Sequence, residues 1–153
     1  MTNRSFRFFA VAVCAAALSV VTAAAPTVAL KKPTITVYKD PSCGCCKNWI
    51  EHLIKHGYRV DAKDSPDMAK IKNTVGVPGE LKSCHTAVVD GYLIEGHVPA
   101  ADIDRLLATK PKVRGLAVPG MPMGSPGMEG PTKQHYQVLA FDRTRKAKVF
   151  ASY

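Results

Sequence analysis

Three of the chain's five cysteines stand within residues 43–46, in the order Cys-Gly-Cys-Cys. An alternating apolar segment typical of a strand precedes them at residues 33–38, and a helical pattern of apolar residues follows at 46–56. Thiols at the start of a helix lie near unpaired N–H groups and the positive end of the helix dipole, which favour the thiolate. Thiolates attack disulfides and bind soft metal ions, so this segment predicts redox or metal chemistry.

A fourth thiol, Cys84, lies in the sequence Ser-Cys-His-Thr at residues 83–86. Vicinal Cys45 and Cys46 are poorly placed as two corners of one tetrahedral ion, but bridging thiolates can hold two neighbouring ions. The spacing therefore favours a small multinuclear Cu(I)–thiolate cluster over a single structural zinc ion. An iron–sulfur cluster, a plain Cys43–Cys46 disulfide and a dithiol enzyme that uses the same pair remain open alternatives.

Two histidines and three methionines are candidate secondary metal ligands. His85 adjoins Cys84, and His97 precedes a predicted helix start. Either histidine could bind metal, and the alternative is a hydrogen bond to the backbone or a surface position. Three methionines lie within eight residues of a Gly/Pro-rich segment: Met121, Met123 and Met128. Thioethers are soft Cu(I) ligands that do not form disulfides, whereas the alternative role is to fill gaps in the core.

The N-terminal segment has the pattern of an export signal. Arg4 and Arg7 precede a nearly continuous apolar run at residues 8–21, and small residues follow at 22–25. We therefore predict a cleaved signal peptide over residues 1–25 and a single exported, periplasmic domain over residues 33–153. The alternative is a membrane anchor, but the apolar run is short for a bilayer span of about 20 residues.

Composition argues against a nucleic-acid partner. Without residues 1–25 the chain has 19 basic and 12 acidic residues, and its few aromatic residues are not interleaved with the basic ones. A solvated surface explains this charge better.

The remaining four cysteines are an even number, which in an exported protein would ordinarily suggest two disulfides. The crowding of three of them favours a redox or metal site.

Periodicity and turn residues predict an α/β protein. The order is β-α-β-α-β-β-α, followed by a Gly/Pro/Met-rich loop at residues 114–133 and a closing hairpin. A capping serine, Ser65, and a proline are expected to start the second helix, in which Met68 is expected to be core. The expected strands are 33–38, 58–62, 86–89, 92–94, 137–141 and 148–151, and the expected helices are 46–56, a segment beginning near 65, and 99–108.

This order, with a C-x-x-C pair between the first strand and helix, resembles the thioredoxin fold over residues 34–108. The loop at residues 84–86 then takes the place of the cis-proline loop, although it contains no proline. The resemblance implies that Cys84 faces the cysteines of residues 43–46. The missing proline and the additional Cys45 depart from the pattern of a general dithiol oxidoreductase.

More specifically, the chain resembles the exported CopG-type family of bacterial copper-resistance proteins. The matching segments are residues 38–46, 84–86, 96–100 and 120–129. The resemblance implies a thioredoxin-like scaffold for copper tolerance with four copper ligands: Cys43, Cys45, Cys46 and Cys84. We expect more than one Cu(I) ion, with redox activity toward copper. The alternatives are a thiol–disulfide oxidoreductase using Cys43 and Cys46, and a periplasmic metallochaperone that serves other exported copper-handling proteins.

The signal pattern generates a direct prediction. The protein is expected outside the cytoplasm and without its first ~25 residues, because a positive start, an apolar run and small residues direct export and cleavage. Mass spectrometry of separated cell fractions measures both properties. An intact N-terminus in the cytoplasmic fraction would contradict the prediction.

Overall fold

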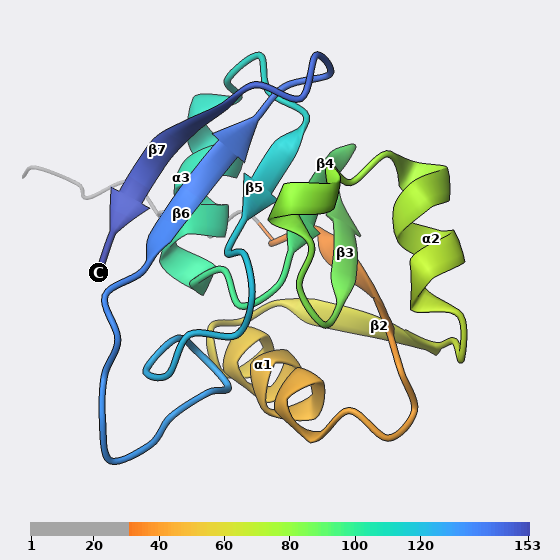
Figure 1. The fold of residues 1–153 in the computed structure, drawn as a ribbon, viewed down its shortest axis with the longest axis vertical. Coiled ribbons are helices and arrows are strands. Elements are labelled where there is room, and N and C mark those ends of the chain that lie inside the picture. The colour runs from red at the N-terminus through yellow and green to blue at the C-terminus, as the bar shows by residue number, and fades with distance from the viewer. Residues whose placement is uncertain (1–30) are drawn as a thin grey trace, which may run out of the picture. The chain divides into compact units, whose positions relative to one another are not determined.

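The computed structural model describes residues 31–153, and the predicted signal segment at 1–25 lies outside them. Over the described range, a seven-stranded sheet carries three α-helices and one short 3₁₀ helix (Figure 1). No helix in this range is long and apolar enough to cross a membrane. The elements are β1 Thr34–Lys39, α1 Gly44–Lys55, β2 Arg59–Asp64, α2 Met68–Val75, η1 Gly79–Leu81, β3 Thr86–Val89, β4 Tyr92–Glu95, α3 Ala100–Thr109, β5 Gly115–Ala117, β6 Gln137–Phe141 and β7 Ala147–Ser152.

The sheet is mixed and mostly antiparallel, with the strand order β2-β1-β3-β4-β5-β6-β7. Parallel pairing joins β1 to β2 and β4 to β5, and the other neighbours run antiparallel. The predicted order of elements through α3 and the predicted closing hairpin are both present. The prediction of a continuous loop over residues 114–133 is wrong at its start, where strand β5 occupies Gly115–Ala117. This strand has three residues, all buried between β4 and β6, so it shows no alternation of polar and apolar side chains.

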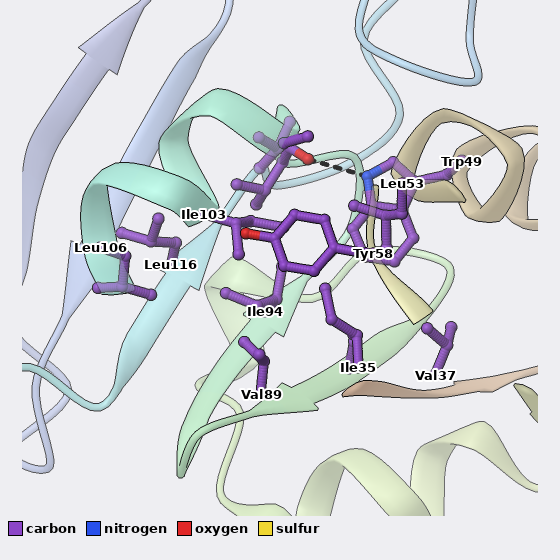
Figure 2. Packing of buried hydrophobic residues seen from close by; sticks show 14 of the residues in the cluster. Ile35, Val37, Trp49, Leu53, Tyr58, Val89, Ile94, Ile103, Leu106 and Leu116 are labelled. Carbon is purple, nitrogen blue, oxygen red and sulfur yellow. Dashed lines mark hydrogen bonds between the residues drawn. The ribbon is translucent and has the colours of Figure 1, made fainter. Parts of the chain in front are cut away.

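Helices α1 and α3 cover one face of the sheet. Trp49 and Leu53 of α1 and Ile103 of α3 pack against apolar side chains of the strands (Figure 2). Alternate residues point to the other face, where Leu93 and Phe141 pack with Val77 and Leu81 from the segment after α2. The core is therefore two layers of side chains with the sheet between them.

The start of α2 differs from the prediction. Asp67, rather than Ser65, is the N-cap, because its carboxylate accepts the Lys70 N–H at 2.9 Å. Ser65 lies two residues earlier and accepts the Asp67 N–H through its hydroxyl oxygen. Met68, predicted as core, is only half-buried. Gly76 ends the helix in the left-handed conformation, with φ of 83°, which glycine adopts without strain.

Helix α1 is tied to the start of α3 by two side chains. The Trp49 indole N–H donates to the Val98 carbonyl at 2.9 Å, the dashed contact in Figure 2. The His52 Nε2 atom accepts the Ala100 N–H at 3.1 Å and so satisfies an N–H group that a helix start leaves without a partner. Burial, followed by the charge of His56, lowers the His52 pKa to about 4 from 6.5.

This contact makes stability depend on pH. Folded His52 gains a proton less readily than unfolded histidine, so the native state should lose stability as the pH falls from about 6.5 to about 4. Because the ring is half-exposed, we expect a contribution of about 1 kcal/mol. Urea unfolding at several pH values measures it. His52→Gln, which can still accept the Ala100 N–H, should flatten the profile, whereas His56→Gln at an exposed position should keep most of it. Equal profiles for both variants would contradict the assignment.

Candidate metal centre

The four predicted cysteines meet where β1 runs into α1. Asp40 shapes the connecting turn, since its carboxylate accepts the Ser42 N–H at 2.8 Å. Cys43 is the N-cap of α1, and Cys45 and Cys46 lie in its first turn. Cys84 approaches from the segment before β3. The four Sγ atoms all lie within 4.8 Å of one another.

Two of these sulfur atoms are bonded to each other. Cys43 and Cys46 form a disulfide with Cα atoms 5.4 Å apart, and Cys45 and Cys84 are free thiols. The Cys45 sulfur lies 3.5 Å from that of Cys43 and 3.9 Å from that of Cys84. The arrangement is therefore an oxidised one, in which a disulfide and two thiols share one small space.

Cys84 lies just before a strand, so no helix start adjoins its thiol. Burial, followed by the neighbouring Cys45 thiol, raises the pKa of Cys84 to about 12 from 9.0. At neutral pH, Cys84 is therefore a thiol. A bound cation would reverse this preference, since metal coordination requires and stabilises the thiolate.

Two buried histidines point ring nitrogens at the Cys84 sulfur. The His85 Nδ1 and His97 Nε2 atoms each lie 3.1 Å from Cys84 Sγ, and together these residues form a second group of potential ligands. The His97 Nδ1 atom lies 2.8 Å from the Pro126 carbonyl oxygen. Because a carbonyl only accepts, this nitrogen carries the proton and leaves the Nε2 lone pair directed at Cys84.

Both histidines are held in the neutral form. Burial lowers the pKa of His85, and His97 and Lys72 lower it further. Burial also lowers the pKa of His97, although the Pro126 carbonyl opposes that effect. The Nε2 atom of His85 is buried without a hydrogen-bond partner among the described residues. Neutral imidazole is the form that binds metal, so both rings suit that role.

A buried ion pair, which the sequence did not reveal, supports the Cys84 segment. The Lys72 ammonium lies 2.6 Å from the Glu95 carboxylate, and both side chains are almost fully removed from water. Glu95 also accepts the Ser83 N–H at 2.7 Å and the Thr86 hydroxyl at 2.6 Å. It therefore binds the residues on both sides of the segment 84–85. Lys72 follows Ile71 on a short polar helix, so no periodic signal marked it as buried.

The methionine-rich loop returns to this site. Gly127 adopts a φ of 84°. A Cβ atom there would lie 2.7 Å from the backbone nitrogen of Trp49 and 2.9 Å from the Cys45 carbonyl oxygen. Only glycine allows so close an approach to α1, beside which the loop runs in Figure 1. Pro126 attaches the same loop to His97. Among the methionines, Met121 is 51% exposed, and Met123 and Met128 are half-buried.

Fold and site together define an α/β protein with a compact set of soft ligand atoms. Two solved structures of copper resistance protein CopG, Form 2 and Form 1, are each 48% identical to the chain. Each match covers 80% of this chain and 98% of the other, with TM-scores of 0.76 and 0.75. Residues 81–128 also match a family described as a protein of unknown function, DUF411. No curated protein sequence matches. The chain belongs to the CopG family of copper resistance proteins.

The buried ion pair generates a prediction. Lys72→Met should lower the free energy of unfolding by about 3–5 kcal/mol, because it leaves the Glu95 carboxylate buried without its cation. Urea denaturation measures the change. Lys70→Met, at an exposed position of the same helix, is the matched control and should stay within about 0.5 kcal/mol of wild type. Similar effects of the two substitutions would show that the pair does not support this segment.

Proposed function

We propose that the protein binds Cu(I) in a thiolate cluster and serves copper tolerance in the periplasm. The observation that carries the proposal is the convergence of four cysteine sulfurs within 4.8 Å, from two segments that are distant in the sequence. The support from relatives is that the solved structures of high identity are copper resistance proteins. The ligands in the reduced protein would be those predicted from the sequence: Cys43, Cys45, Cys46 and Cys84.

The ligand set suits a soft ion in particular. Thiolates select Cu(I) over hard cations, and a thiolate can bridge two ions. Cys45 and Cys46 are consecutive, so bridging uses them better than a single tetrahedral site does. His85 and His97 add two neutral nitrogen atoms beside Cys84. We infer that the cluster holds more than one copper ion and that these histidines are secondary ligands.

Redox state would control the number of available ligands. With the Cys43–Cys46 disulfide formed, only Cys45 and Cys84 remain as thiols. Two electrons and two protons convert the disulfide into two thiols and complete the set. In the opposite direction, oxidation of the pair releases two electrons, which can reduce two Cu(II) ions to Cu(I). Redox activity toward copper therefore belongs to this proposal.

A thiol–disulfide oxidoreductase is the second candidate, and the disulfide itself favours it. Cys43 is half-exposed at the start of α1, whereas Cys46 is fully buried in the first turn. These positions suit an attacking and a resolving thiol, respectively. Such an enzyme needs neither Cys45 nor Cys84, so these two cysteines distinguish the candidates.

We also propose that residues 34–109 form a thioredoxin-like unit. The support is the order β-α-β-α-β-β-α, with the cysteine turn between β1 and α1 and the Cys84 segment directly before β3. In such a scaffold both cysteine segments lie at the same end of the sheet. This common position explains how residues about 40 apart in the sequence can share one ligand set.

The cluster proposal predicts a copper count. Reduced protein titrated anaerobically with Cu(I) against a competing chelator should bind more than one ion, because bridging thiolates allow neighbouring sites. Cys45→Ser and Cys84→Ser should each lower the count, whereas Ser42→Ala, a nearby exposed control, should not. Saturation at one ion, unchanged by Cys45→Ser, would exclude the cluster and favour the dithiol enzyme.

The methionine loop predicts a difference in rate. We propose that it forms a weaker, accessible copper-loading site made of Met121, Met123 and Met128. Changing all three to Leu conserves volume and should cost less than about 1.5 kcal/mol per site. Stopped-flow measurement should then show slower Cu(I) loading with an unchanged final count. Loading at the wild-type rate would assign these side chains to packing.

A further inference from the structure

A concentration of basic residues lies at one end of the sheet. The connections β3–β4, α3–β5 and β6–β7 together carry six basic residues and two acidic ones, and β7 adds one more basic residue. All but Arg114 are exposed. We call this surface the basic end, and its members are Lys110, Lys112, Arg114, Arg143, Arg145, Lys146 and Lys148.

The basic end and the cysteines lie at opposite ends of the sheet. Gly115 begins β5 and pairs with Phe141 at the end of β6, which in turn pairs with Ala147 at the start of β7. The cysteine segments instead adjoin the end of β1 and the start of β3, beside the last residue of β4. In Figure 1 the α3–β5 and β6–β7 connections are at the top and α1 is at the bottom.

The positive charge of the basic end is not neutralised within the protein. None of its seven members forms an ion pair with a carboxylate in residues 31–153. Asp142 lies among them, but its carboxylate accepts the Thr144 N–H at 2.7 Å and the Lys146 N–H at 3.1 Å. That carboxylate therefore holds the β6–β7 turn together and leaves the guanidinium groups of Arg143 and Arg145 free.

One hollow of about 270 Å³ at this end is lined by three arginines and a single carboxylate, that of Asp142, beside Val75 and Gly76. Arg114 is held in place because it donates to the Gly91 and Val75 carbonyls at 3.2 and 3.3 Å. The other two, Arg143 and Arg145, come from the β6–β7 turn, which the Asp142 hydrogen bonds hold together. Guanidinium groups bind phosphate oxygens with paired hydrogen bonds, so the hollow suits a phosphate group.

The composition of this surface favours a membrane over a protein partner. Protein interfaces depend on buried aromatic or large apolar anchors at their centre. Among the described residues, the exposed large apolar side chains are Ile54, Met121, Val149 and Tyr153, and only Val149, next to Lys148 on β7, adjoins the basic end. A diffuse cationic surface without such anchors is typical of binding to anionic lipid headgroups.

We propose that the basic end docks the protein on an anionic phospholipid surface, with headgroup phosphate in the arginine hollow. Docked in this way, the protein presents its cysteine site on the side away from the lipid, where copper and partner molecules can reach it. Each basic residue near such a surface adds attraction that falls off within a Debye length, so docking is reversible and sensitive to salt. The proposal does not depend on the copper stoichiometry.

Vesicle co-sedimentation of the protein as recovered from cells tests this docking, with the same N-terminus in every variant. Wild type should bind phosphatidylglycerol vesicles and be released by 1 M salt, at which the Debye length is about 3 Å. A fourfold variant with Arg143, Arg145, Lys146 and Lys148 changed to Gln should bind on the order of 1,000-fold more weakly. The matched control changes Lys47, Lys63, Lys70 and Lys133 to Gln, which are exposed and lie away from the basic end, and should retain binding within a few-fold. Far-UV circular dichroism and urea unfolding that match wild type show that both variants are folded.

Several outcomes would overturn the proposal. Equal losses in the two fourfold variants would mean that net charge, not the basic end, drives binding. Equal binding to phosphatidylcholine vesicles, or none to phosphatidylglycerol, would exclude anionic headgroups as the target. Stronger capture by polyglutamate beads would assign the surface to an acidic protein. Complete displacement by millimolar inorganic phosphate, against chloride of matched ionic strength, would identify a free-phosphate site instead.

Discussion

The carboxylate of Glu95 holds together the part of the molecule on which the cysteine site depends. It lies at the end of a central strand, fully buried, and contacts Lys72 from α2 and both Ser83 and Thr86 around the Cys84 segment. Burial raises its pKa, and the lysine, the hydroxyl and the N–H group oppose that effect. A buried ion pair adds little net stability over an apolar pair, but losing one partner is costly. Such a pair therefore specifies one position for the segment that carries Cys84.

The second half of the chain completes the same site. Strands β5, β6 and β7 extend the sheet beyond β4, and the loop between β5 and β6 returns to α1. Pro126 orients His97, and Gly127 lies against the backbone of Cys45 and Trp49. The DUF411 match, residues 81–128, spans Cys84, both site histidines and this loop but not the cysteines of α1. The site therefore joins two separate parts of the chain.

The chemical character of the site follows from partial burial. Cys84 and its two histidines are kept neutral by the low polarity around them, so no charge is present to attract hard cations. A soft ion that binds sulfur and neutral nitrogen gains most from such ligands. Under the proposed function, the Cys43–Cys46 disulfide takes two sulfurs out of the ligand set, so redox state adds a second level of control. The basic end lies at the other end of the sheet.

Local signals in the sequence were sufficient for most elements and for the candidate ligands. Alternation at residues 33–38, the Asp90-Gly91 turn and the apolar spacing around Trp49 act over short distances, so they predicted β1, the β3–β4 hairpin and α1. The order Cys-Gly-Cys-Cys likewise predicted soft-metal or redox chemistry, and the resemblance added Cys84 as a partner of these cysteines. Only the tertiary structure decided the rest. Strand β5 exists because two neighbours pair with it, and Asp67 caps α2 because its carboxylate reaches a free N–H. The burial of Lys72 with Glu95 and the tautomer of His97 depend on partners distant in the chain, which no local pattern can specify.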